Sequence, residues 1–168
     1  MDETTFDECY RATVRRLVQY AYAMCGDADV AQDLAHEAYL RAWQRRRRLE
    51  GYEDIEAWLR LVVTRLSVDR WRRIAVHRRT LARLRPPPPA QPPSDDTVLL
   101  AAALREIPAQ QRRAVVLHYL VGLPVADVAA EIGTSAGTVK SWLARGRAAL
   151  GAHLGDGPAF AGKEHGDA

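Results

Sequence analysis

The side chains best suited to binding chemistry lie near the end of the chain, on a stretch expected to be a helix. Lys140, Arg145 and Arg147 are cationic there, and Ser141 adds a hydroxyl. Arginine and lysine make the commonest contacts with guanine edges in the DNA major groove, and both pair with phosphates. The spacing therefore favours a helix surface that binds DNA over the alternative, a solvated face of a helical bundle.

The N-terminal end of the same helix adds a second feature. A tight turn is predicted over Gly133, Thr134 and Ser135, followed by Gly137. Free backbone N–H groups and a positive partial charge at a helix N-terminus attract phosphate. A short amphipathic helix, 125–132, precedes the turn. Two short helices joined by such a turn make a helix-turn-helix.

Charge is segregated along the rest of the chain. Residues 60–85 carry nine arginines and one acid, Asp69, for a net charge of +8. Residues 1–59 carry a net −4 and residues 98–155 a net +3, although the whole chain carries only +3. Such blocks predict an anionic partner that binds at defined places.

No motif in the sequence indicates an enzyme. P-loop, G-x-S-x-G and H-E-x-x-H motifs and Cys/His metal spacings are absent. Cys9 and Cys25 form no CxxC pair, which favours a reducing cytoplasm. No apolar run reaches the roughly 20 residues of a membrane span, and no signal peptide opens the chain. We expect a cytoplasmic protein with no membrane insertion, catalytic residue, cofactor or metal.

The elements that position these residues are all expected to be helices, so the predicted fold class is all-α. In a first domain, residues 1–84, apolar periodicity predicts helices over 6–24, from about 28 to 43 and from about 55 to 84. Within the predicted helix from about 28 to 43, Asp33, Glu37 and Arg41 share one polar face.

Six prolines within residues 85–96 forbid a helix and indicate a semi-rigid linker. A second domain, residues 97–154, follows, and residues 155–168 are expected to be a flexible tail. The second domain is predicted to contain four helices, over 98–107, 109–121, 125–132 and 137–150. The last of them is expected to turn Val139, Leu143, Gly146 and Leu150 inward.

Together these segments resemble a bacterial extracytoplasmic-function (ECF) RNA polymerase sigma factor, group four. In the second domain, Leu104 to Leu117 and Asp127 to Arg147 are similar to region four. In the first domain, Asp33 to Trp43 is similar to the region-two helix that binds polymerase. Two further stretches are similar to the helix that handles the minus-ten element: Ala57 to Leu59 and Asp69 to Arg73. The resemblance covers about residues 6–152, in family order.

The resemblance implies an alternative sigma factor that directs core RNA polymerase to specific promoters. Its partners would be promoter DNA, the clamp and flap of core polymerase, and an anti-sigma factor, with the chain associated with the nucleoid. The positions that match the clamp-binding helix are Asp33, His36, Glu37 and Leu40, and His36 stands where the family usually has Gln.

For the minus-ten element, the family holds a flipped base between a loop, here about Gly51 to Glu56, and the following helix. The matching helix positions are Arg60, Thr64, Arg65, Asp69, Arg72 and Arg73. Arg65 stands where the family often has Asn, which changes the base-recognition chemistry because Arg only donates hydrogen bonds.

For the minus-thirty-five element, the match extends the basic helix described above to its N-terminal turn. The matching positions are Thr134, Ser135, Gly137, Thr138, Lys140, Ser141, Arg145 and Arg147. His118 stands where the family can carry an Arg that touches the DNA backbone. Trp58 and Trp142 are expected to pack inside, whereas Trp71 fits packing and strand contact equally.

Three other functions remain open from the residues. A different helix-turn-helix regulator would explain residues 98–154 but not the first domain. An enzyme has no supporting motif, and an interaction module that uses the prolines as its ligand leaves the helix-turn-helix unexplained.

Overall fold

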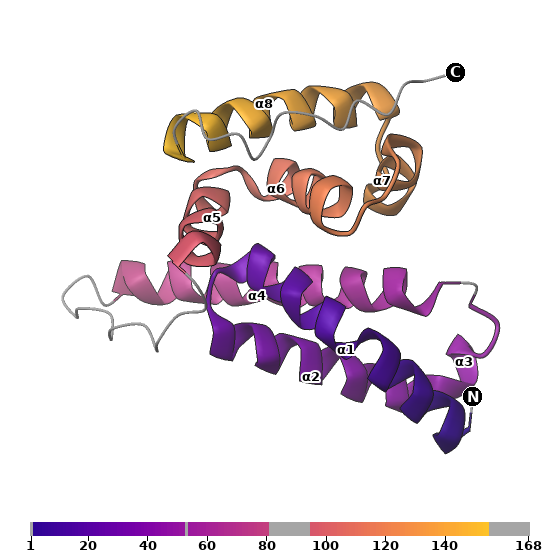
Figure 1. Cartoon of the computed structure of the whole chain (residues 1–168). Helices are drawn as coiled ribbons and strands as arrows, with labels where there is room; N and C mark the ends of the chain where they lie inside the picture. The colour runs from indigo at the N-terminus through magenta and orange to yellow at the C-terminus, as the bar shows by residue number, and fades with distance from the viewer. Residues whose placement is uncertain (1, 53, 81–94, 155–168) are drawn as a thin grey trace.

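The computed structural model describes residues 2–52, 54–80 and 95–154, without the side chains of 71–80, 95 and 154. All regular structure in these ranges is helical, which confirms the all-α prediction (Figure 1). The first half contains α1 (Glu3–Cys25), α2 (Ala28–Gln44), α3 (Arg46–Leu49) and α4 (Ile55–Thr80). The second contains α5 (Asp95–Glu106), α6 (Ala109–Val115), the π-helix η1 (Val116–Leu120), α7 (Val125–Ile132) and α8 (Ala136–Leu154).

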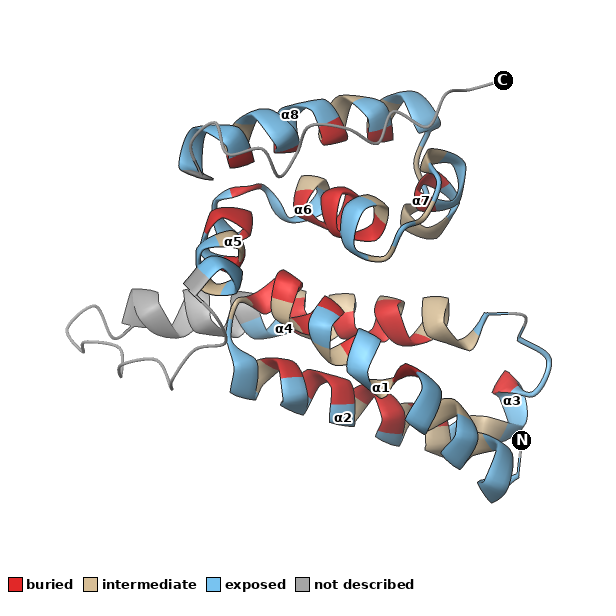
Figure 2. Cartoon of the chain, in the orientation of Figure 1, coloured by how far each residue is buried: buried red, intermediate tan, exposed pale blue. Residues whose placement is uncertain are grey.

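The helices pack in two groups that touch. In Figure 1, α1, α2 and α4 lie together, α6, α7 and α8 form a second group, and α5 stands between them. Contacts of α1 with α5, α6 and η1 join the groups. Buried residues of both groups belong to one apolar cluster, and Figure 2 shows them on the facing sides of the helices. The two predicted domains therefore lie against each other in this structure.

Local sequence signals set the helix ends. The α1 helix stops at Gly26, whose φ of 72° continues no right-handed helix. Asp27 caps α2, because its side chain accepts a hydrogen bond from Val30 N at 3.0 Å. A Gly-Asp pair is therefore enough to end one helix and begin the next. In the second half, Gly133 ends α7 with φ 77°, which makes the tight turn before α8.

The inward face of α8 is the one predicted. Val139, Leu143 and Leu150 are buried, and so is Gly146. A Cβ atom on Gly146 would collide with the side chain of Val115 on α6, so only glycine allows these two helices to approach so closely. This close packing fixes the orientation of the outward, basic face of α8.

The predicted helix over 109–121 changes type before its end. It is α-helical to Val115 and then becomes the π-helix η1, in which Val121 N donates to Val116 O at 3.1 Å. The His118 ring closes this turn, since its Nδ1 lies 2.8 Å from Leu123 O. His118 is half-buried, and its ring is held against the backbone of the following turn.

The buried side of α4 is broader than the expectation for Trp58 alone implies. Trp58, which was expected to pack inside, is half-buried and packs against the apolar cluster, and Leu59 and Val63 beside it are fully buried. Both α1 and α2 pack on α4, and Glu131 of α7 pairs with Arg60, so the buried surface of α4 is wider than one stripe of apolar residues.

A buried hydrogen bond ties α1 to α2. The hydroxyls of Thr13 and Tyr39 are 2.6 Å apart, and Thr13 Oγ1 also donates to Cys9 O at 2.7 Å. Tyr39 therefore donates to Thr13. Burial is the main cause that raises the pKa of Tyr39 from 10 to about 12.

We expect this tyrosine to make the fold sensitive to alkali. Unfolded Tyr39 would lose its proton from pH 10 upward while the folded one keeps it, so the free energy of unfolding falls between pH 10 and 12, by up to about 2 kcal/mol. Tyr39→Phe should remove that part of the fall and cost about 1 kcal/mol at pH 7. Urea unfolding of both proteins at pH 7 and 11 tests this, and parallel losses in the two would contradict it.

Candidate nucleic-acid and polymerase interfaces

The start of α8 is ordered by its own hydroxyls. Ser135 Oγ accepts from Thr138 N at 3.1 Å and lies 2.9 Å from Thr138 Oγ1. Ser135 is thus the N-cap of α8, which leaves its hydroxyl at the surface where the remaining N–H groups of the first turn point. Thr134 is half-buried and Gly137 exposed.

Farther along α8, the predicted DNA-facing residues share the solvent side. Lys140, Arg145 and Arg147 are exposed, and Arg145 Nη2 donates to Ser141 Oγ at 2.7 Å. This bond orients one guanidinium and leaves its other donors available. The structure therefore brings together the eight predicted residues at one end and one face of α8, while Trp142 is half-buried against the core as predicted.

The predicted polymerase-docking residues lie along α2. Asp33 and His36 are exposed, Leu40 is 55% exposed, and half-buried Glu37 accepts from Arg41 Nε at 2.8 Å. Glu37 and Arg41, which are four residues apart, therefore pair on the surface of α2, as the predicted polar face requires. Leu40 lies beside this polar face and is one of several exposed large apolar side chains among the described residues.

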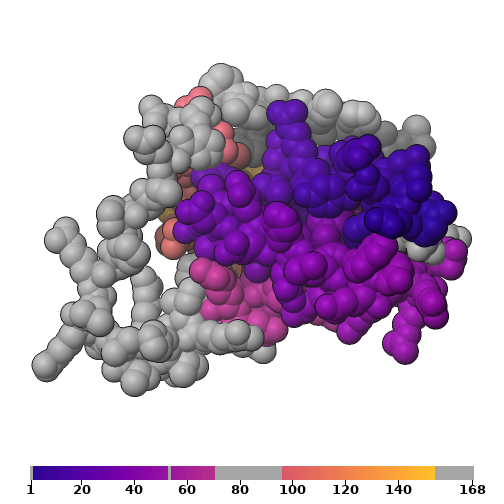
Figure 3. All heavy atoms as spheres, turned by 90° about the horizontal axis from the view of Figure 1, so that it is seen from below, coloured from indigo at the N-terminus to yellow at the C-terminus, as the bar shows by residue number. Residues whose placement is uncertain are grey.

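A groove of about 430 Å³ runs beside this face, between α1 and α2. Figure 3 shows the side of the molecule on which α1 and α2 lie next to each other. His36 lines the groove, so it links the exposed face to this hollow; the other lining residues are Tyr10, Val14, Arg15, Val18, Gln19, Gln32, Ala35 and Tyr39.

The predicted minus-ten residues on α4 divide into different environments. Arg65 and Asp69 are exposed. Thr64 is half-buried, donates to Arg60 O and lies 2.8 Å from the Tyr20 hydroxyl. Arg60 is only 6% exposed. The side chains of Arg72, Arg73 and Trp71 lie outside the described residues.

Arg60 is covered by the second half of the chain. Its Nη2 donates to Glu131 Oε2 on α7 at 2.8 Å, and its Nε is 3.2 and 3.3 Å from the two carboxylate oxygens. Arg113 of α6 lies 3.9 Å from the same carboxylate and donates to Glu131 O. Burial alone would lower the pKa of Arg60, but the hydrogen bonds and charge of Glu131 outweigh it and raise that pKa.

A second polar contact joins the two groups at the end of α1. Arg112 of α6 is 8% exposed, and its Nη1 donates to Met24 O at 2.6 Å. Its Nη2 donates to Ile107 O and Arg105 O within its own half. Burial is the main cause that lowers the pKa of Arg112. A buried arginine held by backbone carbonyls fixes how α6 sits on α1.

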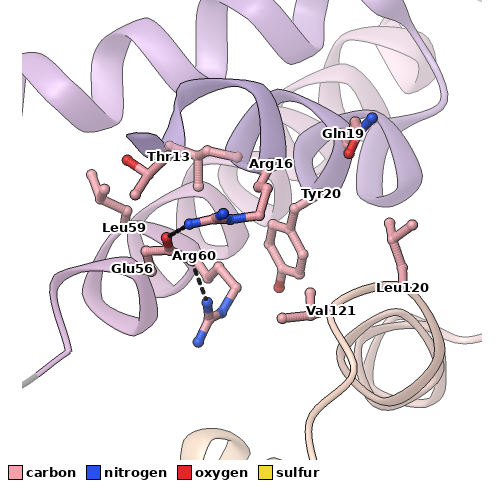
Figure 4. Close-up of a pocket in the computed structure, with 10 residues that line it drawn as sticks. Thr13, Arg16, Gln19, Tyr20, Glu56, Leu59, Arg60, Leu120 and Val121 are labelled. Atoms are coloured by element: carbon pink, nitrogen blue, oxygen red, sulfur yellow. Dashed lines mark hydrogen bonds and ion pairs between the residues drawn. The ribbon is translucent and has the colours of Figure 1, made fainter. Parts of the chain in front are cut away.

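A small pocket of about 190 Å³ marks the same junction (Figure 4). Tyr20 and Arg16 of α1 and Arg60 of α4 line it from one group, and Leu120 and Val121 line it from the other. In the close-up Arg16 points to Glu56, with which it forms an ion pair. The pocket is therefore bounded by both halves and would change if they separated.

Sequence reasoning missed the residues that build this junction. Glu131, Arg112 and Arg113 carried no predicted role, and Arg60 was assigned only to DNA. Arginines in a basic block are normally solvated, and no local pattern reveals a partner 71 residues away. For Arg112 and Arg113 the one sequence signal was their place in α6, where the helical periodicity turns inward.

The described ranges contain neither a candidate membrane span nor a candidate metal site. No helix there is long and apolar enough to cross a membrane. Nor do those residues gather three or more His, Cys, Asp or Glu side chains that could hold a metal ion.

Comparison with known families matches both halves of the chain. The Sigma-70 region 2 family matches residues 9–76. The Sigma-70, region 4 family matches residues 97–150. The first match contains the α2 face and most of α4, and the second contains the whole helix-turn-helix.

Relatives and solved structures agree with these matches. The chain is 30% identical to the ECF RNA polymerase sigma factor SigM of Mycobacterium tuberculosis H37Rv over 155 residues, which cover 92% of this chain and 79% of SigM. It is 31% identical to SigE of Mycolicibacterium smegmatis, covering 89% and 62%. The sigma factor RpoE of Bartonella quintana, solved with the anti-sigma factor NepR, matches with a TM-score of 0.75 and 25% identity over 89% of this chain and 96% of RpoE.

Proposed function

The chain belongs to the ECF family of RNA polymerase sigma factors and directs core RNA polymerase to specific promoters, and we propose that it does so through three separate surfaces. Region two, residues 1–84, holds the polymerase-docking and minus-ten surfaces. Region four, residues 97–154, holds the minus-thirty-five surface. Residues 85–94 of the proposed linker and the tail 155–168 lie outside the described residues, and α5 begins at Asp95, two residues before the proposed boundary.

One observation supports this function above the alternatives: both regions occur on one chain in family order. A helix-turn-helix repressor would need only the second half. The test is in vitro transcription with purified core polymerase and a pool of promoter fragments. We expect start sites that depend on the chain, and the absence of any dependent transcript would refute the proposal.

The docking surface is proposed to be Asp33, His36, Glu37 and Leu40, which bind the clamp of the largest polymerase subunit, with the flap as a further contact. The exposed Leu40 beside a charged stripe supports this, because an apolar anchor rimmed by polar groups is typical of protein interfaces. A chain with this role acts in the cytoplasm at the nucleoid and is not an enzyme.

The proposed DNA surfaces are the exposed face of α8 and the first half of α4. Lys140 and Arg145 would contact bases or phosphates of the minus-thirty-five element, aided by the capped N-terminus of α8. Arg65 and Asp69 would face the minus-ten strand directly. Arg60 would join them only after it is released from Glu131.

The distance between the promoter elements requires that release. Their names place them 25 base pairs apart, which is about 85 Å at 3.4 Å per step. A compact chain of this length has a radius of gyration of about 15 Å. Both elements therefore cannot be read while region four lies on α1 and α4. Core polymerase, which binds both regions, would hold them apart.

Two consequences follow for the free protein. It should bind promoter DNA weakly, because region four covers Arg60 and each surface alone is small. In the holoenzyme the second contact becomes intramolecular, which raises the overall affinity. Promoter binding should also fall steeply with salt, since Arg and Lys contacts release counterions. Equally tight, sequence-specific binding by the free chain would contradict this account.

An anti-sigma factor is the proposed regulator. Structural neighbours support it, because RpoE was solved together with NepR. The chain offers such a protein the junction between its two halves, where the pocket beside Tyr20 and Leu120 lies. A protein bound across that junction would keep the halves together.

Arg145→Ala should weaken promoter use without affecting polymerase binding. Loss of one base contact costs about 1–3 kcal/mol, so transcription at limiting holoenzyme should fall roughly tenfold or more. Abortive transcription assays and a core pull-down, run on the same preparation, test the two halves of the statement. Reduced recovery of core polymerase would count against the assignment of α8 to DNA.

A further inference from the structure

The guanidinium of Arg145 is held at one place on α8 by a single hydroxyl. Its Nη2 donates to Ser141 Oγ at 2.7 Å, and Ser141 stands four residues earlier in the helix. Four residues correspond to about 6 Å along a helix axis. The bond therefore draws the guanidinium back toward the N-terminal end of α8, which is the end that contacts base edges in a helix-turn-helix.

This partner leaves the positive charge of Arg145 uncompensated. The sequence of α8 contains no Asp or Glu, so no carboxylate on the helix competes for the guanidinium. Ser141 is half-buried and Arg145 is exposed, so the hydroxyl is the fixed end of the pair. In Figure 1, α8 forms the outer edge of the second group, and its main contacts are with α5, α6 and α7. The charged end of the pair is therefore open to a ligand rich in hydrogen-bond acceptors.

The bond also leaves one complete pair of donors on the guanidinium. A guanidinium carries five N–H groups in a planar fork, and two of them point the same way along each edge. Ser141 takes one hydrogen of Nη2, so one edge, formed by Nε and Nη2 or by the two Nη atoms, keeps both of its donors. Two parallel donors match the O6 and N7 acceptors that guanine presents in the major groove. Adenine offers one acceptor and one donor there, so it cannot satisfy both.

Small residues surround the pair on the same face of the helix. Gly137 lies four residues before Ser141 and Ala144 three residues after it, and both are exposed. A Cβ atom on Gly137 would come no closer than 3.9 Å to a neighbouring side chain, that of Ser135, so the packing does not require glycine at this position. The absence of bulk lets a base edge approach the guanidinium closely.

The other cations of α8 are not held in this way. Lys140 and Arg147 are exposed, and among the described residues neither has a hydrogen bond or an ion pair from its side chain. Mobile cations suit phosphates, whose contacts carry no sequence information. We infer that Ser141 positions Arg145 to read one guanine of the minus-thirty-five element, while Lys140 and Arg147 bind phosphates. This assignment rests on the proposed minus-thirty-five role of α8.

The test uses the reconstituted holoenzyme and a fragment of a promoter that the holoenzyme transcribes. Each guanine of the minus-thirty-five element, on either strand, is replaced in turn by 7-deazaguanine, which lacks the N7 acceptor. Fluorescence anisotropy gives the affinity for each fragment. At one guanine the replacement should weaken binding by the wild-type holoenzyme about fivefold or more. Arg145→Ala should remove that difference, because no side chain then reads N7.

Ser141→Ala isolates the positioning role. The change keeps every charge and introduces a better helix former, so the chain should fold as before. Affinity for the natural fragment should fall about three- to tenfold, as for the loss of one hydrogen bond. The discrimination at the one guanine should shrink, while the slope of log affinity against log salt stays the same. In the Arg145→Ala background, adding Ser141→Ala should change the affinity by less than about twofold.

Two variants serve as controls. Ser141→Thr keeps the hydroxyl and should retain most of the discrimination at the one guanine. Arg147→Ala removes a charge from the same helix, so it should lower the salt slope by about 0.9 and keep the discrimination at every guanine. A merely structural role of Ser141 would weaken binding to all fragments alike and would not select one guanine.

Each outcome decides the matter. Unchanged discrimination in Ser141→Ala, or an equal loss from Ser141→Ala with and without Arg145, overturns the inference. A minus-thirty-five element in which no guanine depends on Arg145 overturns it as well. In all of these cases transcription by the wild-type holoenzyme leaves the proposed function intact. A wild-type holoenzyme that transcribes no promoter would remove the proposed function and this inference together.

Discussion

Glu131→Ala should separate the two halves of the free chain and increase its affinity for minus-ten single-stranded DNA. The carboxylate of Glu131 holds Arg60 at 2.8 Å and lies 3.9 Å from Arg113, and the side chains of both arginines are only 7% exposed. Removing one partner of a buried ion pair costs about 3–5 kcal/mol, because the remaining charge is left without compensation. Separation of the halves relieves that cost by returning both arginines to water.

The expected shift is large. At 1.4 kcal/mol for each factor of ten, a loss of 3–5 kcal/mol moves the ratio of closed to open forms by roughly 100-fold or more. Arg112, which donates to Met24 O, and the apolar contacts of α1 with α5 still favour the closed form. Because the closed form loses 3–5 kcal/mol, small-angle X-ray scattering should show a larger radius of gyration for Glu131→Ala, with each half still folded.

A charge control separates opening from simple electrostatics. Asp127 lies on the same helix as Glu131 but is exposed. Asp127→Ala removes the same charge, so it should raise DNA affinity slightly and leave the radius of gyration unchanged. Equal DNA affinity and equal size for the two variants would show that the ion pair does not hold the halves together. In the holoenzyme both variants should transcribe alike, because core polymerase already keeps the regions apart.

Features set by neighbouring residues could be predicted from the sequence. The Gly26-Asp27 stop and cap, the turn at Gly133 and the inward stripe of α8 depend on φ values, capping side chains and 3.6-residue periodicity. Such signals lie within a few positions of one another. For the same reason the exposed, basic face of α8 and the polar stripe of α2 were placed correctly.

Features set by contacts between the two halves could not. Arg60 was predicted at a DNA surface, yet it is buried because α7 brings Glu131 over it. Arg112 is buried for a similar reason, against a carbonyl 88 residues earlier. A linker rich in proline suggested two independent modules, and nothing local specifies how they pack. The change to a π-helix at Val116 likewise has no sequence signature at that position.

Leu40→Asp should abolish most core polymerase binding while leaving the chain folded. Leu40 is 55% exposed, so little of the fold depends on its side chain, and Asp in place of Leu within a helix costs about 0.5 kcal/mol. In the proposed interface the leucine would lose its burial, worth about 1.5–3 kcal/mol, and a carboxylate would have to be desolvated beside Asp33 and Glu37. We expect affinity for core polymerase to fall by about 100-fold, and transcription with it.

Leu99 provides the matched control for this prediction. It is 58% exposed on α5, far in sequence from the docking face. Leu99→Asp makes the same chemical change at equal exposure, so it should leave core binding within about twofold. Titration of labelled core polymerase with each variant gives the two affinities directly. If both aspartates weaken binding equally, or if Leu40→Asp binds as tightly as the unchanged chain, the proposed docking surface on α2 is wrong. If only Leu40→Asp fails, the exposed leucine of α2 is the apolar anchor of the polymerase contact.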